Sequence, residues 1–264
     1  MPLHAVCQHD PMPQSPEPTW VIDLDGVVWL ADEPIPGSAD AIGQLRRSGR
    51  RVLFATNNAA PTVEELLTRL DAAGVPASSD ELVTSAQAAA AMLEPGTTAF
   101  PCADGGVIEA LHARGVIVVD GPPADAVVVG WTKRFDFDLL ATTATLIRGG
   151  ARFIGTNEDA THPTPERVLP GSGALLAAVA TAAQAVPEVA GKPHEPMAAL
   201  VRERAPGAVL MVGDRPSTDG ALAGQLGVPF ALVRSGVTRD GREPITVQPD
   251  EDAPDLATLV ARHL

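Results

Sequence analysis

Short apolar runs alternate with amphipathic stretches near both ends of the chain. The apolar runs are rich in β-branched and aliphatic residues and lie at 20–24, 51–55, 208–212 and 228–233. Runs of this kind are typical of parallel strands that are buried on both faces. Helical periodicity fills the stretches 38–48, 62–73 and 216–226. The alternation predicts right-handed βαβ crossovers and a doubly wound, mostly parallel α/β sheet.

The middle of the chain carries a second set of such runs. Its candidate strands lie near 97–100, 116–119, 126–130 and 152–155. Helical patterns alternate with them at 105–113, 136–148 and 172–184. The set is long enough for an inserted α/β domain of about a hundred residues, which is a common domain size. We therefore expect a core domain comprising residues 19–82 and 191–264, interrupted by an α/β cap domain at 83–190.

The two ends of the chain lack this alternation. Residues 1–18 contain five prolines among scattered polar residues, without the pattern of a signal peptide, and we expect a flexible extension there. Residues 238–254 are rich in Asp, Glu and Pro, which indicates solvated surface. Residues 256–264 have a short helical pattern that we expect to pack against the core.

Two carboxylates follow the first apolar run. Asp23 comes directly after Ile22, at the carboxyl end of the predicted strand, where open α/β sheets hold their ligands. Asp25 returns to the same side by the two-residue period of a strand, and Gly26 turns the chain. Adjacent carboxylates repel each other, so the pair suits a divalent cation or a shared proton. An acidic turn without function is the alternative, because Asp-Gly is a common turn dipeptide.

Small polar residues end the second apolar run. Thr56, Asn57 and Asn58 lie at a predicted strand-to-helix turn, with Pro61 and Thr62 at the start of the next helical pattern. Hydroxyl, amide and free backbone N–H groups at such a turn suit a phosphate oxygen. Thr and Asn are also favoured as helix N-caps, which is the structural alternative.

Three charged residues in the last third of the chain complete the candidate site. Lys192 is one of only two lysines among 19 basic residues, and a compact ammonium can neutralise a phosphoryl group or a carboxylate. Asp214 ends the apolar run that begins at 208. Asp219 follows in the first turn of the next predicted helix, where an acidic residue is also favourable for the helix dipole.

The order of these groups resembles the four-motif signature of the haloacid dehalogenase superfamily of phosphohydrolases. The resemblance covers about residues 19 to 240 and rests on Asp23-Leu24-Asp25-Gly26, Thr56, Lys192, and Gly213-Asp214 with Asp219. The segments 56–58, 153–159 and 169–173 are similar to the type IIA branch. That branch includes nitrophenyl, nucleotide, pyridoxal, phosphoglycolate and glycerol-3-phosphate phosphatases.

This resemblance implies Mg²⁺-dependent hydrolysis of a small-molecule phosphate monoester through an aspartyl phosphate. It implies that Asp23 is the nucleophile and that Asp25 is the general acid and base. Mg²⁺ would be held by the Asp23 carboxylate, the Asp25 backbone carbonyl and Asp214. Asp219 would orient water molecules or Lys192 without contacting the metal. The residues implied to hold phosphoryl oxygens are Thr56, Asn57, Asn58 and Lys192.

The leaving group is less well defined by the sequence. The segment 83–87 is similar to glycerol-3-phosphate and nitrophenyl phosphatases, which favours those substrates. His162 instead resembles a pyridoxal phosphatase histidine that reaches the substrate from the cap, although a loop histidine without a role fits equally well. Pyridoxal phosphate, phosphoglycolate and nucleotide monophosphates therefore stay as alternative substrates. A phosphotransferase and a non-catalytic phosphoester-binding protein are alternatives from other classes.

The charge and the cysteine content limit which binding partners and which cellular compartment we expect. A net charge of −14 and a pI near 4.7 argue against nucleic acid or an anionic membrane as a partner. The longest small-apolar stretch, 174–183, is too short for a membrane span. Cys7 and Cys102 indicate neither a disulfide framework nor a zinc site, so we expect a cytoplasmic protein. The resemblance also allows a homodimer formed through the cap.

Overall fold

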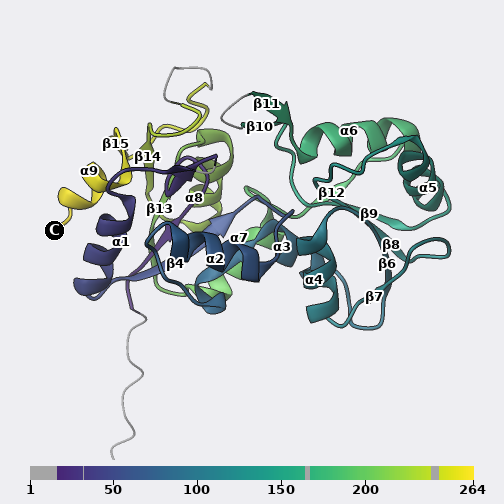
Figure 1. The fold of residues 1–264 in the computed structure, drawn as a ribbon, viewed down its shortest axis with the longest axis horizontal. Helices are drawn as coiled ribbons and strands as arrows, with labels where there is room; N and C mark the ends of the chain where they lie inside the picture. Colours follow the sequence, from purple (N-terminus) through teal and green to yellow (C-terminus); the bar gives the residue numbers. More distant parts are fainter. Residues whose placement is uncertain (1–16, 32, 164–166, 239–243) are drawn as a thin grey trace, which may run out of the picture.

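The computed structural model describes residues 17–31, 33–163, 167–238 and 244–264. Figure 1 shows two lobes side by side, each built on one sheet. In both sheets the neighbouring strands run parallel. The α/β fold with an inserted α/β cap, predicted from the alternating pattern, is therefore confirmed.

The larger sheet has the strand order β15-β14-β13-β1-β4-β5. In chain order its strands are β1 (Thr19–Ile22), β4 (Arg51–Thr56), β5 (Leu82–Thr84), β13 (Ala208–Gly213), β14 (Phe230–Val233) and β15 (Glu251–Ala253). Helices α1 (Ser38–Arg47), α2 (Val63–Ala72) and α9 (Leu256–Ala261) pack on one face. Helices α3 (Ser85–Ala91), α7 (Glu195–Arg204) and α8 (Ala221–Leu226) pack on the other. The larger sheet therefore lies between two layers of helices.

The smaller sheet has the strand order β12-β9-β8-β6-β7. In chain order its strands are β6 (Thr98–Cys102), β7 (Ile117–Val118), β8 (Ala126–Val129), β9 (Arg152–Gly155) and β12 (Glu188–Val189). Helices α5 (Phe137–Arg148) and α6 (Ser172–Ala183) cover one face, and α4 (Gly105–Ala113) covers the other. A short hairpin, β10 (Thr161–Pro163) and β11 (Val168–Pro170), leaves this lobe beside α6 (Figure 1).

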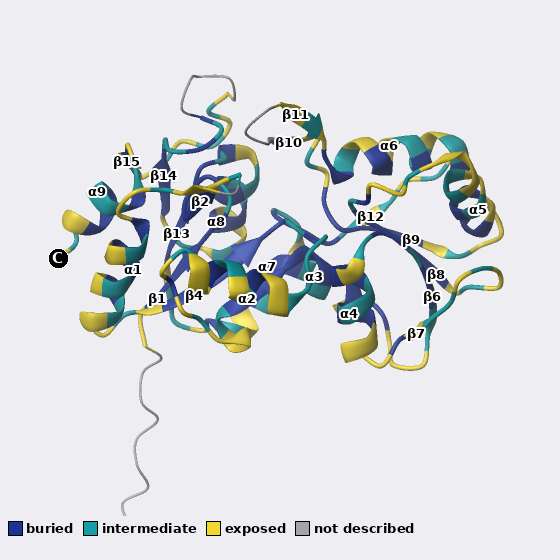
Figure 2. Ribbon diagram, in the orientation of Figure 1, coloured by how far each residue is buried: buried dark blue, intermediate teal, exposed yellow. Residues whose placement is uncertain are grey.

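Apolar packing is continuous between the two lobes. One cluster of buried residues runs from Val21 on β1 through the alanines of α3 to Val107 on α4 and Val128 on β8. Figure 2 shows the central strands of both sheets as buried and the outward turns of the helices as exposed. Burial of apolar area on this scale is the main favourable term in folding, so the shared cluster couples the lobes.

Several elements were not predicted from the sequence. The hairpin of β2 (Trp29–Leu30) and β3 (Glu33–Pro34) follows the Asp-rich turn, and β15 lies within the acidic stretch that we expected to be solvated surface. Strands as short as these form because they pair with a neighbouring strand. A local sequence pattern does not reveal that pairing. The helix predicted at 216–226 is divided into a π-helical turn, η2 (Pro216–Gly220), followed by α8.

Two expectations about the chain organisation stay predictions. Strand β5 belongs to the larger sheet and β12 to the smaller one, but the domain boundaries at 83 and 190 are not settled by sheet membership. Of the expected flexible extension at 1–18, residues 1–16 lie outside the described residues. Within the described ranges, no helix combines the length and the apolar character needed to cross a membrane.

Candidate active site

The carboxyl ends of three adjacent strands meet at one pocket. Strand β1 lies between β13 and β4 in the sheet, so Asp23, Asp214 and Thr56 emerge side by side at the ends of these strands. All three line a cavity of about 170 Å³. This is the edge at which parallel sheets place their ligands, because the following loops and helix N-termini open there.

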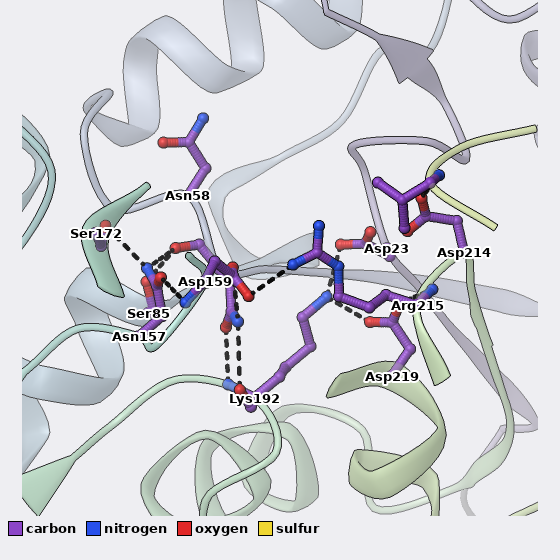
Figure 3. A network of polar contacts seen from close by, with 12 residues as sticks. Asp23, Asn58, Ser85, Asn157, Asp159, Ser172, Lys192, Asp214, Arg215 and Asp219 are labelled. Carbon is purple, nitrogen blue, oxygen red and sulfur yellow. Dashed lines mark hydrogen bonds and ion pairs between the residues drawn. The ribbon is translucent and has the colours of Figure 1, made fainter. Parts of the chain in front are cut away.

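A buried ion cluster occupies the floor of this pocket. The Lys192 Nζ atom donates to Asp23 Oδ1 at 2.6 Å and to Asp219 Oδ1 at 2.7 Å, as Figure 3 shows. Carboxylate oxygens of Asp23, Asp214 and Asp219 lie within 4.8 Å of one another. All four residues are buried. The cluster therefore holds three carboxyl groups around a single ammonium, and negative charge is in excess when all are ionised.

Burial and the neighbouring charges together shift the pKa values in this cluster. Burial raises the pKa of Asp23 well above its ordinary value; the nearby Lys192 ammonium offsets part of this rise, and the Asp219 and Asp214 carboxylates add to it. Burial likewise raises the pKa of Asp214 to about 7. Burial alone would lower the pKa of Lys192, but the Asp219 and Asp23 carboxylates reverse this and raise it. Lys192 therefore stays protonated, whereas the Asp23 and Asp214 carboxyl groups need further positive charge nearby to be fully ionised.

The Asp214 carboxylate is held in a cradle of backbone. The Val237 N–H donates to Asp214 Oδ2 at 2.6 Å, and the Thr238 hydroxyl donates to the Asp214 backbone carbonyl at 3.0 Å. A Cβ atom on Gly26 or Gly236 would overlap the carboxylate. Gly26 also has a φ of 86°, which glycine adopts without strain. Glycine at these two positions leaves room for the Asp214 carboxylate to lie near Asp23.

The donor set of this cluster fits a hard divalent cation. Its ligand atoms are carboxylate oxygens and its negative charge is in excess, and Mg²⁺ in proteins is bound by such oxygen ligands. Asp219 is the least available of the three, because it also accepts a hydrogen bond from the Arg215 N–H at 3.0 Å in addition to Lys192. Asp23 and Asp214 are therefore the residues best placed to hold a metal.

The polar residues after β4 are brought to the same pocket. Thr56 Oγ1 accepts a hydrogen bond from the Asn58 N–H at 3.0 Å. The Asn57 side chain accepts from the Lys192 N–H at 2.7 Å and donates to the Lys192 carbonyl at 3.2 Å. Asn57 thus fixes the backbone that carries the buried lysine. Thr56, Asn57 and Asn58 line the cavity, and a substrate-binding role for them stays a prediction.

Two charged residues that the sequence analysis did not single out join the lobes across the pocket. Arg215 follows Asp214 in the larger lobe, and its guanidinium lies 3.2 Å from Asp159 Oδ1 in the smaller lobe. The Asn57 side chain donates to Asp159 Oδ2, also at 3.2 Å. Figure 3 shows Arg215 pointing toward Asp159 above Lys192. Asp159 closes the 153–159 segment of the resemblance, which was the available signal for it.

His162 reaches the pocket from the smaller lobe. It lies on β10 and lines the same cavity as Asp23. Its ring centroid is 5.6 Å from that of Trp131, whose indole N–H donates to the Pro170 carbonyl at 2.9 Å. Residues 164–166, next to this histidine, lie outside the described residues. A contact between His162 and a substrate stays a prediction.

Comparison with known proteins agrees with this geometry. A model of haloacid dehalogenase-like hydrolases matches residues 20–117, and an HAD-hydrolase-like model matches residues 189–259. The chain is 33% identical over 250 residues to an acid sugar phosphatase of Staphylococcus saprophyticus, covering 91% of this chain and 96% of that protein. It is 35% identical over 228 residues to a dihydroxyacetone phosphatase of Corynebacterium glutamicum, covering 84% and 82% of the two chains.

A solved structure is similar over nearly the whole fold. The glycerol phosphate phosphatase of Mycobacterium tuberculosis in complex with magnesium matches with a TM-score of 0.84 and 34% identity, covering 92% of this chain and 76% of that one. These matches agree with the buried cluster of Asp23, Lys192, Asp214 and Asp219, and all of them point to one family. The chain belongs to the haloacid dehalogenase-like hydrolase family, and it is a phosphoric monoester hydrolase.

Proposed function

We propose that this enzyme hydrolyses phosphate monoesters of small hydroxylated molecules, such as glycerol 3-phosphate or dihydroxyacetone phosphate, through a phosphorylated Asp23. The observation that carries the proposal is the buried contact of Asp23 with Lys192, with Asp25 and Asp214 beside it in the pocket. The names of the relatives support the substrate class, because sugar, triose and glycerol phosphates all have hydroxylated leaving groups.

The proposed metal is Mg²⁺, held by the Asp23 carboxylate, Asp214 and the backbone carbonyl of Asp25. When bound, it would neutralise charge on the carboxylates and on the phosphoryl oxygens. Lys192 would hold the Asp23 carboxylate in one orientation and stabilise the negative charge that develops on the transferred group. Asn57 would keep Lys192 in place through its two backbone hydrogen bonds.

The proposed chemistry has two steps that use the same pair of carboxyl groups. An Asp23 oxygen forms a bond to phosphorus as the ester P–O bond breaks, and Asp25 gives its proton to the leaving alkoxide. A water molecule then attacks the aspartyl phosphate and gives its proton to Asp25. Inorganic phosphate leaves, and the Asp23 carboxylate is restored. Water must be excluded during the first step, which explains why a second lobe covers the pocket.

Phosphate release from a panel of esters, with and without Mg²⁺, tests this proposal. We expect Mg²⁺-dependent release from glycerol 3-phosphate, dihydroxyacetone phosphate and 4-nitrophenyl phosphate. The tilted ring pair of Trp131 and His162 at the pocket favours one second candidate, pyridoxal phosphate, because it offers an aromatic leaving group a surface to contact. A kcat/KM for pyridoxal phosphate above those of the glycerol and triose esters would favour that candidate. Absence of release from every ester would reject the proposed function.

The metal proposal predicts a specific defect for Asp214→Asn. The substitution keeps the shape of the side chain and its hydrogen bond from Val237, but it removes one of the few charged ligands. We expect the Mg²⁺ concentration for half-maximal activity to rise by about ten-fold or more, in line with the loss of a charged ligand. A Mg²⁺ titration of 4-nitrophenyl phosphate turnover measures this. Asp252→Asn, on an exposed ion pair with Arg234, is the control. An unchanged titration curve, or full activity in excess chelator, would contradict the assignment.

The contact between the lobes predicts a different defect for Asp159→Ala. The change removes the acceptor that ties Arg215 and Asn57 to the smaller lobe. Hydrogen bonds to charged groups contribute about 1.5–3 kcal/mol each, so we expect kcat/KM to fall by roughly ten-fold or more. The free energy of unfolding should fall as well, by less than this range for each hydrogen bond lost, because Asp159 is partly exposed to solvent.

Asp125→Ala is a matched control for Asp159→Ala. Asp125 accepts two hydrogen bonds from Thr98 within the smaller sheet and does not line the pocket. Steady-state kinetics on glycerol 3-phosphate should therefore separate the two variants. Equal kinetic losses in both variants, or no loss in Asp159→Ala, would show that the contact between the lobes does not affect catalysis.

A further inference from the structure

The Trp29 side chain folds back onto Asp25. Its indole Nε1–H donates a hydrogen bond to Asp25 Oδ1 at 3.0 Å. The intervening turn brings the two residues together, because the Leu24 carbonyl accepts from the Val28 and Trp29 N–H groups at 2.9 and 3.3 Å. The Gly26 N–H also donates to the Trp29 carbonyl at 2.6 Å. The contact is thus built by the backbone of the turn that follows β1.

The Trp29 ring is held rigidly. It is only 1% exposed and belongs to the apolar cluster on the α1 and α2 face of the larger sheet. The guanidinium of Arg69, on α2, lies 4.2 Å from the ring centroid. A cation over an aromatic face adds attraction to the packing. The indole N–H therefore has one available direction, and that direction is toward Asp25.

We propose that Trp29 is a positioning residue that selects which oxygen of Asp25 exchanges protons. An indole N–H can only donate, so Oδ1 of Asp25 is kept as an acceptor. The other oxygen, Oδ2, is then the one that gives a proton to the leaving alkoxide and takes one from the attacking water. This inference rests on the proposed function, since it assigns a geometry to the proton transfers of Asp25.

A kinetic test compares leaving groups in Trp29→Phe, which keeps the aromatic packing and removes the donor. With enzyme in excess, a single turnover isolates the first step. Because proton transfer typically contributes about 10²–10⁴-fold, we expect glycerol release from glycerol 3-phosphate to slow by roughly ten-fold or more. Nitrophenol release from 4-nitrophenyl phosphate should slow by no more than about two- to three-fold, because nitrophenolate leaves without a proton. KM should stay nearly constant for both esters.

Trp20→Phe is the matched control for the packing effect. Trp20 is 2% exposed on β1 and contacts the His263 ring, away from the pocket. Its replacement should alter both release rates by the same small factor. A Trp29→Phe variant that slows both esters equally, or slows neither, would reduce Trp29 to a packing residue and overturn the proposal.

A second measurement does not depend on activity. The chain has three tryptophans, so a ¹⁵N indole spectrum contains three Nε1–H signals. Trp29→Phe assigns its signal by deletion, and Trp20→Phe with Trp131→Phe does so by elimination if Trp29→Phe does not fold. We expect Asp25→Ala to shift the Trp29 signal and leave that of Trp20 in place. An unmoved signal would disprove the contact. An inactive wild type with a shifted signal would reject the proposed function but keep the contact.

Discussion

Turnover in the Asp23→Asn variant is expected to fall by about 10⁴-fold or more, as is typical when the nucleophile of a covalent mechanism is removed. The amide keeps the size of the side chain but cannot attack phosphorus. Folding should be affected little, because Lys192 keeps its ion pair with Asp219 and because burial, which raises the pKa of Asp23, already disfavours the charged form of Asp23. Phosphate release from 4-nitrophenyl phosphate and far-ultraviolet circular dichroism measure the two properties.

Asp40→Asn is the control for this experiment, because Asp40 is an exposed carboxylate on α1. Acid quenching during turnover of ³²P-labelled substrate adds a direct observation, since label should remain on the wild-type protein and be absent from Asp23→Asn. Activity of the variant within ten-fold of the wild type would rule out Asp23 as the nucleophile. Label retained by the variant would place the phosphoryl group on another residue.

Replacement of Lys192 with Met is expected to reduce both stability and activity. Removal of one partner from a buried ion pair typically costs about 3–5 kcal/mol, because the remaining charge is left without compensation. Here two partners, Asp23 and Asp219, lose their cation at once. Urea unfolding in chelator should reveal this loss in the free energy of unfolding. Turnover in Mg²⁺ should fall by about 10²–10³-fold, the range found when a preorganised stabilising group is removed.

The stability loss in Lys192→Met should depend on pH. The folded-state pKa of Asp23 is raised by burial, so charged Asp23 without Lys192 disfavours the folded state at neutral pH. As the pH falls through that raised pKa, the carboxyl group becomes neutral, and the difference between variant and wild type should narrow. Lys133→Met is the control, because the only other lysine of the chain is exposed, and surface changes are usually within about 0.5 kcal/mol. Equal stability of the two variants would contradict a structural role for the ion cluster.

The local pattern of the sequence determined the architecture and much of the pocket floor. Apolar runs that end in Asp23, Thr56 and Gly213-Asp214 predict strands whose polar ends lie at one edge of a parallel sheet. The order of β13, β1 and β4 in the sheet then makes these residues neighbours. This much was predictable because it depends on continuous apolar runs and on which residue ends each run, and both can be read from adjacent residues.

Only the tertiary structure decided how distant segments complete the site. Lys192 pairs with Asp23 across 169 residues of chain, and Asn57 holds the Lys192 backbone across 135. The Asp159 contact with Arg215 depends on the placement of one lobe against the other. The π-helical turn that brings Asp219 to the lysine departs from the helix that its pattern predicted. Contacts of this kind are set by packing between elements, which leaves no periodic signal in the residues that make them.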